Sequence, residues 1–314
     1  MSLLQDWASA PTTGAYEEHE IGSVLRQAVE STVWLPFANR SNISSGQTLT
    51  LPIRGRLSEP TNSALTESMT IPLDKLTITA KTITMVERGR GVQVTRKAMN
   101  RSPIALLEEH KMALSEQMGL DFDTVLSNAF QGGQLKYAAT GAASYNLATN
   151  GTFGTAALSN PNFYHMRKLR DLAFRTYFMP KLASGKYAYV TSTAGYRGIL
   201  DDPEFLEINK NGNSSVFGKN FVGTIADVEV FEDNHTLADN LGTGTDVGEG
   251  VFIARDAVEY AMIQQPTIHY DASDSVATDF GRFVSIAWYG DWGAGTTSDV
   301  ATAGLARLIH FGST

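Results

Sequence analysis

The longest regular pattern of apolar and polar positions lies between residues 102 and 133. Ser102 and Pro103 suit the cap and first position of a helix, and Gly132 and Gly133 suit its end. The pattern predicts one helix over residues 103–131, about 40 Å long, which exceeds the usual length in globular domains. Its apolar residues recur three, four or seven positions apart, as on one helix face: Ile104, Leu107, Leu114, Met118, Phe122, Val125 and Ala129.

The residues before position 47 form a weak pattern with little apolar content of their own. Residues 1–14 are small and polar and are predicted to form a flexible arm. Residues 17–34 predict a modest amphipathic helix that Pro36 ends. Because no other core-forming stretch lies beside them, we expect these residues to pack against a partner surface.

Residues 47–100 alternate between apolar and polar positions, which predicts β structure. One strand is predicted around residues 49–53 and a longer one over 73–86, with a polar, turn-rich segment over 54–69 between them. The alternation slips by one residue near Lys81, which predicts a β-bulge. A two-stranded ribbon is only marginally stable alone in water, so we expect this hairpin to dock on another surface.

The rest of the chain predicts a mixture of helices and strands. Residues 134–160 are rich in small and polar residues and are predicted to form a loop, as are 207–220 and 236–250. Helices are predicted over residues 160–178 and 193–206. The predicted strands are residues 187–192, 222–231, 251–263, 267–270, 280–291 and 301–311, of which the last four are expected to form one final sheet. The fold class is therefore α+β, without βαβ alternation or internal repeats.

Composition narrows the possible roles. The chain has 314 residues, of which 42% are hydrophobic and 18% charged, which suits a folded protein of about two domains. It has no cysteine, which excludes disulfides and cysteine-ligated zinc and fits a reducing compartment. The net charge of −8 argues against polyanion binding as the main role. There is neither an apolar run of membrane-spanning length nor a secretory signal, so cytosolic folding is expected.

Two short motifs resemble functional sites but lack a required residue, and one acidic cluster matches no fixed motif. Gly89-Arg-Gly91 begins a dinucleotide-binding pattern, yet position 94 is Val, so a bulge in a β run is the expected role of these glycines. Residues 239–249 have the composition of a calcium loop, but Leu241 stands where an oxygen ligand is needed. A solvated turn is expected for the acidic residues Asp271, Asp274 and Asp279.

The chain contains six histidines, and none of them pairs at a metal-binding spacing. No nucleophile elbow is present, although a Ser–His–Asp site assembled from distant residues stays open. The sequence thus nominates no catalytic, cofactor-binding or metal-ligating residue, and no cofactor. Ordinary salt bridging is the expected role of a local group of basic residues, with nucleic acid or an acidic neighbour as the alternative: Arg88, Arg90, Arg96, Lys97 and Arg101.

The order of the predicted elements resembles a known family. An amphipathic arm, a long β-hairpin, a long helix headed by Ser-Pro, an α/β portion and a terminal sheet follow one another as in the Hong Kong 97 (HK97)-fold major capsid proteins of tailed bacteriophages, particularly the podophage-type branches. The segments that look similar to this family are residues 64–79, 93–103, 120–126, 187–192 and 220–230.

The resemblance implies a domain organisation. Residues 1–47 would be the N-terminal arm and residues 48–85 the extended loop (E-loop). Residues 86–158 and 251–314 would form the peripheral domain, which includes the spine helix over 103–131. Residues 159–250 would form the axial domain, whose loops meet at the five-fold and six-fold centres.

The resemblance also implies partners and a location. The chain would assemble with copies of itself into pentamers and hexamers of an icosahedral head that encloses double-stranded DNA without sequence-specific binding. A separate scaffolding protein, a portal and decoration proteins are the other implied partners, with no membrane. Assembly would take place in the host bacterial cytoplasm and the product would be the virion. Some family members cross-link a loop lysine to a neighbour; for Lys75 and Lys81 we expect non-covalent contacts.

Three other functions stay open at this stage. An encapsulin-type nanocompartment shell shares the fold and also assembles. A soluble α+β hydrolase requires a pocket with perturbed titratable groups. A monomeric binding module leaves the hairpin as an exposed edge with a risk of aggregation, and it ranks last.

Overall fold

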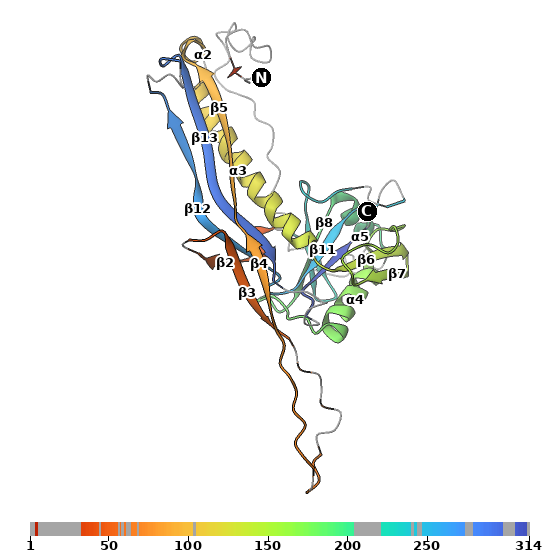
Figure 1. The fold of residues 1–314 in the computed structure, drawn as a ribbon. Coiled ribbons are helices and arrows are strands. Elements are labelled where there is room, and N and C mark those ends of the chain that lie inside the picture. Colours follow the sequence, from red (N-terminus) through yellow and green to blue (C-terminus); the bar gives the residue numbers. More distant parts are fainter. Residues whose placement is uncertain are drawn as a thin grey trace.

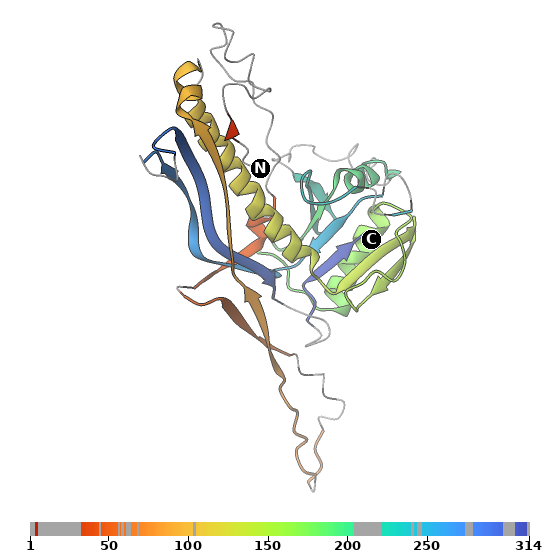
Figure 2. The same ribbon diagram turned by 45° about the horizontal axis from the view of Figure 1, so that its top comes forward.

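The computed structural model shows an elongated α+β chain with a projecting hairpin at one end of a long sheet-and-helix body and a compact second body beside it (Figure 1). A view turned by 45° shows the same arrangement, with the long helix running from the far end of the first body to the second body (Figure 2). The residues that the structure describes are 4–5, 33–43, 45–55, 57, 60, 64–67, 69–102, 105–203, 221–239, 242–243, 247–273, 279–297 and 305–312.

The predicted long helix is present as α3 (Leu106–Gln131), but its start differs from the prediction. Residues Arg96–Arg101 form a separate short helix, α2, which Thr95 caps through its side chain. Ser102 is not the cap of the long helix: its backbone N–H ends α2 by donating to the Ala98 carbonyl. Pro103 and Ile104, predicted as the first residues of the helix, lie outside the described residues.

The first body is a five-stranded sheet with α3 packed along one face (Figure 1). Leu114 of α3 lies against Trp288 and Trp292, with Leu107, Met118, Phe122 and Val125 around them, so these five residues of the predicted stripe pack on one face. In sheet order the strands are β1 (Leu4–Gln5), β5 (Val86–Thr95), β13 (Phe283–Thr296), β12 (Val258–Asp271) and β2 (Ala38–Asn42).

The bulge expected at Gly89 and Gly91 is absent. β5 pairs with β13 in unbroken register from Val86 to Thr95. A Cβ atom at Gly89 would lie 2.7 Å from the Trp288 carbonyl oxygen, and one at Gly91 would lie 3.0 Å from the Ala287 Cβ. These glycines therefore allow two backbones to approach closely rather than marking an extra residue.

The predicted hairpin consists of β3 (Thr48–Arg54) and β4 (Ile78–Thr84), which pair antiparallel from Thr48–Thr84 to Arg54–Ile78. The bulge predicted near Lys81 is wrong, because the register does not shift along this ladder. The strand keeps its alternation with Lys81 and Ile83 on one side, and Ile78 and Ala80 lie on the other, exposed side.

The second body is a seven-stranded mixed sheet covered on both faces. Helices α4 (Phe163–Asp171) and α5 (Thr193–Leu200) contribute to the core on one face, together with a π-helical turn over Leu172–Thr176. The C-terminal half of α3 covers the other face through Leu126 and Phe130. In sheet order the strands are β7 (Ser144–Ala148), β6 (Leu135–Gly141), β14 (Leu308–Phe311), β11 (Gly250–Ile253), β8 (Tyr187–Thr191), β10 (Val228–Glu232) and β9 (Phe221–Ile225).

Several sequence predictions in this region need correction. The loop predicted over residues 134–160 contains the hairpin β6–β7, whose small residues Ala138 and Ala139 are buried because both faces of the sheet are covered. The single strand predicted over 222–231 is two strands joined at Ala226–Asp227, both of which have positive φ. The last four predicted strands do not form one sheet: β11 and β14 lie in the seven-stranded sheet, whereas β12 and β13 lie in the five-stranded sheet. The strand predicted over 251–263 is divided between β11 and β12, and the one predicted over 267–270 is part of β12.

Other predictions are confirmed, or concern residues outside those that the structure describes. The strand over 187–192 is β8, and the helices over 160–178 and 193–206 are present in shorter form as α4 and α5. The N-terminal amphipathic helix (17–34) and the loop over 207–220 lie outside the described residues, except for Val33 and Trp34. Pro36 lies in a 3-10 turn over Leu35–Phe37.

Candidate functional site

The projecting hairpin presents apolar side chains that nothing else in the described structure covers. Leu73 is 93% exposed and Ile71 is 64% exposed. Monomeric proteins rarely leave such a contiguous apolar stretch in water, so this surface is suited to contact another molecule. The large apolar residues exposed between the two strands and on β4 are Leu57, Leu65, Met69, Ile71, Leu73, Leu76 and Ile78.

The base of the hairpin is anchored to the first body. Ile83 of β4 and Met85 pack against Ala261 of β12, with Leu49 and Leu51 at the margin. Lys81 lies on the same side and donates from Nζ to Thr296 Oγ1 at 2.6 Å. Anchoring at the base therefore directs the hairpin, whereas its outer part lies far from the rest of the chain (Figure 1).

A groove of about 570 Å³ lies where the hairpin leaves the body. Leu51 and Ile53 of β3 form one wall, and Asp256 and Arg307 contribute charged groups that lie 3.6 Å apart. Asn39 of β2 donates to Asp256 at 2.7 Å. The groove thus combines an apolar wall with a paired Asp256 and Arg307, and Arg54 and Glu259 also line it.

A second feature is the junction at which the N-terminal segment meets α3. Trp34 is completely buried and its ring stacks on Phe130 of α3 at 5.1 Å. Its backbone N–H donates to Asp123 Oδ1 at 3.3 Å, and its indole N–H donates to Thr236 Oγ1 at 2.8 Å. Trp34 therefore fastens three segments that are distant in sequence.

The loop after β10 completes this junction through Asp233. Its Oδ2 accepts from the Thr236 hydroxyl at 2.6 Å and from the backbone N–H groups of Thr236 and Leu237, both at 3.0 Å. Asp123 and Asp233 are both buried. Trp34 and Thr236 connect the two carboxylates through hydrogen bonds. Burial raises the pKa of Asp123 to about 6, and the neighbouring Asp233 acts in the same direction.

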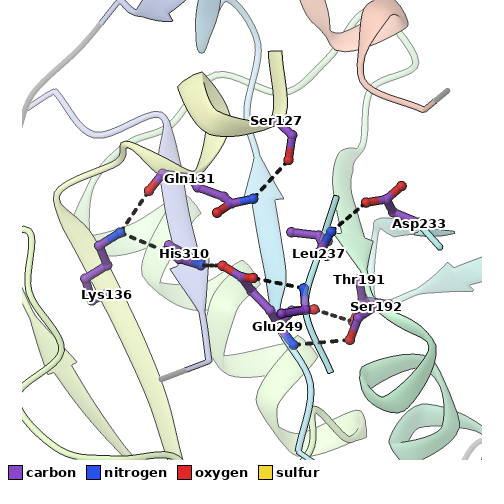
Figure 3. Close-up of polar contacts among 10 residues, drawn as sticks. Ser127, Gln131, Lys136, Thr191, Ser192, Asp233, Leu237, Glu249 and His310 are labelled. Carbon is purple, nitrogen blue, oxygen red and sulfur yellow. Dashed lines mark hydrogen bonds and ion pairs between the residues drawn. The ribbon is translucent and has the colours of Figure 1, made fainter. Parts of the chain in front are cut away.

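A third feature is a buried polar network within the seven-stranded sheet (Figure 3). His310 of β14 lies between Lys136 of β6, whose Nζ is 2.7 Å from Nδ1, and Glu249, whose carboxylate meets Nε2. Lys136 also donates to the carbonyl of Gln131, at 2.8 Å. Glu249 connects further to the backbone N–H of Ala238, at 3.2 Å.

The hydrogen-bond pattern fixes the protonation of this network. Lysine is only a donor, so Nδ1 of His310 accepts and Nε2 carries the proton that is donated to Glu249. Burial lowers the pKa of His310 and the pKa of Lys136. The groove at the hairpin base is lined by residues other than these. The network joins β6, β14 and the residue before β11, and it therefore acts as an internal support of the sheet.

Two other histidines and one acidic residue of the predicted motifs make structural contacts. His165 accepts from the Tyr137 hydroxyl at 2.8 Å and donates to the Gly141 carbonyl at 3.0 Å, and His269 stacks on Tyr289. Asp239, from the loop with calcium-like composition, accepts from the Ala194 N–H. Within the described residues, no three His, Asp or Glu side chains are placed to hold a metal ion.

The predicted acidic turn is described in part. Asp271 accepts from the Ser273 N–H, and Asp279 pairs with Arg282 at 2.8 Å, as a solvated turn requires. Asp274 and His19 lie outside the described residues. Of the local basic residues, Arg88 forms a salt bridge with Asp121 at 3.7 Å, which fits the structural interpretation.

Sequence reasoning missed the junction and the buried network. Both depend on residues brought together from distant parts of the chain, since Trp34 and Asp123 are 89 positions apart and Lys136 and His310 are 174 apart. A signal did exist in α3, where Asp123 and Ser127 lie among apolar positions. None of the helices that the structure describes is long and apolar enough to cross a membrane.

Comparison with known proteins identifies the fold. No family model and no curated protein matches the sequence. The capsid of Helicobacter pylori bacteriophage KHP30, described as acid-stable, matches with a TM-score of 0.70 and 12% identity over 93% of this chain and 94% of that one. The cyanophage Pam1 capsid gives 0.65 and 14% identity, over 96% and 97%.

A third match, to Mycobacterium phage Bobi, covers 99% of both chains with a TM-score of 0.61 and 13% identity. Because these matches cover nearly the whole chain, the HK97-like capsid fold expected from the order of elements is confirmed. At this identity the likeness shows the fold, and function has to be argued from it.

Proposed function

We propose that this chain is the major capsid protein of a tailed bacteriophage, which assembles into the icosahedral head around double-stranded DNA. The observation that carries this proposal is the agreement in fold with phage capsids over more than nine-tenths of both chains. Two of the matching structures are described as phage capsids, one of them as a capsid asymmetric unit, which favours a phage head over a nanocompartment shell. The podophage-type branch is the finer part of the proposal.

The exposed hairpin supports self-association. Its apolar side chains, from Leu57 to Ile78, have no cover within the described chain, and a neighbouring copy would supply one. Contacts of this kind make the stability of a subunit depend on assembly. We assign residues 48–85 to the extended loop on this basis, and residues 1–47 to the arm.

The other domain assignments are part of the same proposal. The peripheral domain would comprise residues 86–158 and 251–314, and the axial domain residues 159–250. The seven-stranded sheet takes strands from both ranges, so the two domains would share this sheet. Pentamers and hexamers of this chain, a separate scaffolding protein, a portal and decoration proteins are the proposed partners. Assembly in the bacterial cytoplasm and a final location in the virion complete the proposal.

The test is the size of the purified recombinant chain, measured by light scattering and electron microscopy. Closed shells, or rings of five and six subunits, are expected, either from the chain alone or after co-expression with the scaffolding protein of the same phage. A chain that stays a 34.0 kDa monomer even with that scaffold would contradict the proposal. Shells that package an enzyme instead of DNA in the native host would favour the nanocompartment.

A further inference from the structure

The junction around Trp34 contains a buried carboxylate that is incompletely satisfied. Oδ1 of Asp123 accepts from the Trp34 N–H at 3.3 Å, but Oδ2 has no hydrogen-bond partner among the described residues. Nδ1 of His235, in the adjacent loop, likewise has no partner there. A buried ionised carboxylate with an unpaired oxygen is much more costly than its neutral, protonated form.

The groups around Asp123 determine how its charge is tolerated. Asp233 disfavours the ionised form because it places a second negative charge nearby, and a positive charge on His235 favours it. From the N-terminal segment, the backbone N–H groups of Val33 and Trp34 favour the ionised form. Burial outweighs these contributions, and it raises the pKa of Asp123 to about 6.

Trp34 connects the two carboxylates. Its backbone N–H binds Asp123, and its indole N–H reaches Asp233 through the Thr236 hydroxyl, at 2.8 and 2.6 Å. Any movement of the N-terminal segment away from α3 would expose Asp123 to water and break both connections at once. The charge on Asp123 and the position of the segment are therefore linked.

We propose that Asp123, Trp34 and Asp233 form a proton-controlled latch that holds the N-terminal segment against the long helix and tightens when Asp123 takes up a proton. The direction follows from the geometry, because protonation removes the charge that the closed site accommodates poorly. The latch goes beyond the capsid proposal and does not depend on it, since all three residues lie in one chain.

The pH window follows from the two states of Asp123. In the open state its carboxyl group is solvated and titrates near its ordinary value of 3.8, and in the closed state it titrates near 6. Closure is therefore most favourable below about pH 4, weakens as the pH rises to about 6, and is constant above that. The closing equilibrium is expected to change roughly 100-fold across this window.

The experiment is hydrogen–deuterium exchange of the full-length, unassembled chain between pH 4 and 7.5, corrected for intrinsic exchange rates. Amides of residues 33–38 are expected to lose protection as the pH rises from 4 to 6, relative to the buried strand β8 in the same molecule. A wild-type profile for residues 33–38 that is flat, or that merely follows β8, would overturn the proposal without any variant.

Two variants sharpen the test. Asp123→Asn retains an oxygen acceptor but carries no charge, so its protection is expected to be high and independent of pH. Glu116→Gln, on the same helix, removes a charge outside the junction and should keep the wild-type profile. Persistence of the pH dependence in Asp123→Asn would show that another group controls the segment and would refute the latch.

Discussion

Lys136 and His310 lie on the neighbouring strands β6 and β14, with Nζ and Nδ1 2.7 Å apart inside the seven-stranded sheet. Both are potential cations, and they coexist because the histidine is neutral and its other nitrogen faces Glu249. Burial lowers the pKa of both residues, which keeps the histidine neutral at physiological pH. This relationship makes the network a support whose members depend on one another.

Lys136→Met is expected to lower the free energy of unfolding by about 1–3 kcal/mol, because Nδ1 of His310 and the Gln131 carbonyl lose their donor in a buried site. Urea unfolding of the unassembled chain measures this. Lys111→Met is the matched control, since Lys111 lies at the surface and, among the described residues, pairs with Glu108 on the same helix, at 2.9 Å. Its effect should stay below about 0.5 kcal/mol. Equal effects of the two variants would contradict a buried support.

The buried side chain of His165 is expected to lower the free energy of unfolding in acid. Burial lowers its pKa from 6.5 to about 4, so the folded state resists protonation that the unfolded state accepts. The contribution of this residue is complete above about pH 6.5 and declines as the pH falls to about 4, by roughly 3 kcal/mol. The measurement is the difference in pH dependence of unfolding between wild type and His165→Gln. Parallel profiles for the two proteins would rule out His165 as the source.

Changes in the hairpin are expected to impair assembly without impairing the folding of the single chain. Leu73→Asp alters a side chain that is 93% exposed, so the free energy of unfolding of the single chain should change by less than about 0.5 kcal/mol. Shell formation, measured by electron microscopy, should be strongly reduced. Deletion of residues 56–74 should reduce shell formation even more, while the chain still folds. Normal shells from the deletion variant would contradict the assignment of this segment as a contact between copies.

Replacement of two glycines by alanine is expected to change the stability of the unassembled chain in opposite directions. A Cβ at Gly119 of α3 meets no atom within 4 Å, so Gly119→Ala should stabilise the unassembled chain by about 0.5–1 kcal/mol. A Cβ at Gly293 of β13 would lie 2.3 Å from the Thr84 carbonyl oxygen, so Gly293→Ala should destabilise it. Thermal unfolding of both variants checks the pair. Stabilisation by Gly293→Ala would mean that β4 and β13 do not approach as described.

The sequence predicts best those parts of the fold that depend on local periodicity. The long helix and the hairpin each bury one regular face, and their periodic patterns are therefore visible in the chain. Strand β8 is a short run that is buried on both faces, and its apolar residues mark it. The order of these elements was enough to suggest the fold. The predicted helix stripe omits Leu126 and Phe130, because the end of α3 packs against two bodies and therefore has two buried faces.

Local patterns do not predict which sheet a strand joins or which distant polar residues meet. Strands β11 and β12 are separated by a few residues, yet they belong to different sheets, and only long-range pairing decides this. Strand β6 was missed because a sheet covered on both faces tolerates alanine and glycine, which otherwise indicate a loop. The Trp34 junction needs three distant segments, and none of its residues forms a motif by itself.

The position of β14 has a consequence for synthesis on the ribosome. This strand lies between β6 and β11, so residues 135–137 pair with residues 309–311 in the interior of the sheet. The second body cannot close until translation has passed residue 311, although α3 and the hairpin have emerged long before. A prematurely terminated chain would lack an interior strand and the histidine that joins Lys136 to Glu249. In a shell-forming protein, this order of events would exclude incomplete chains from the lattice without any separate proofreading factor.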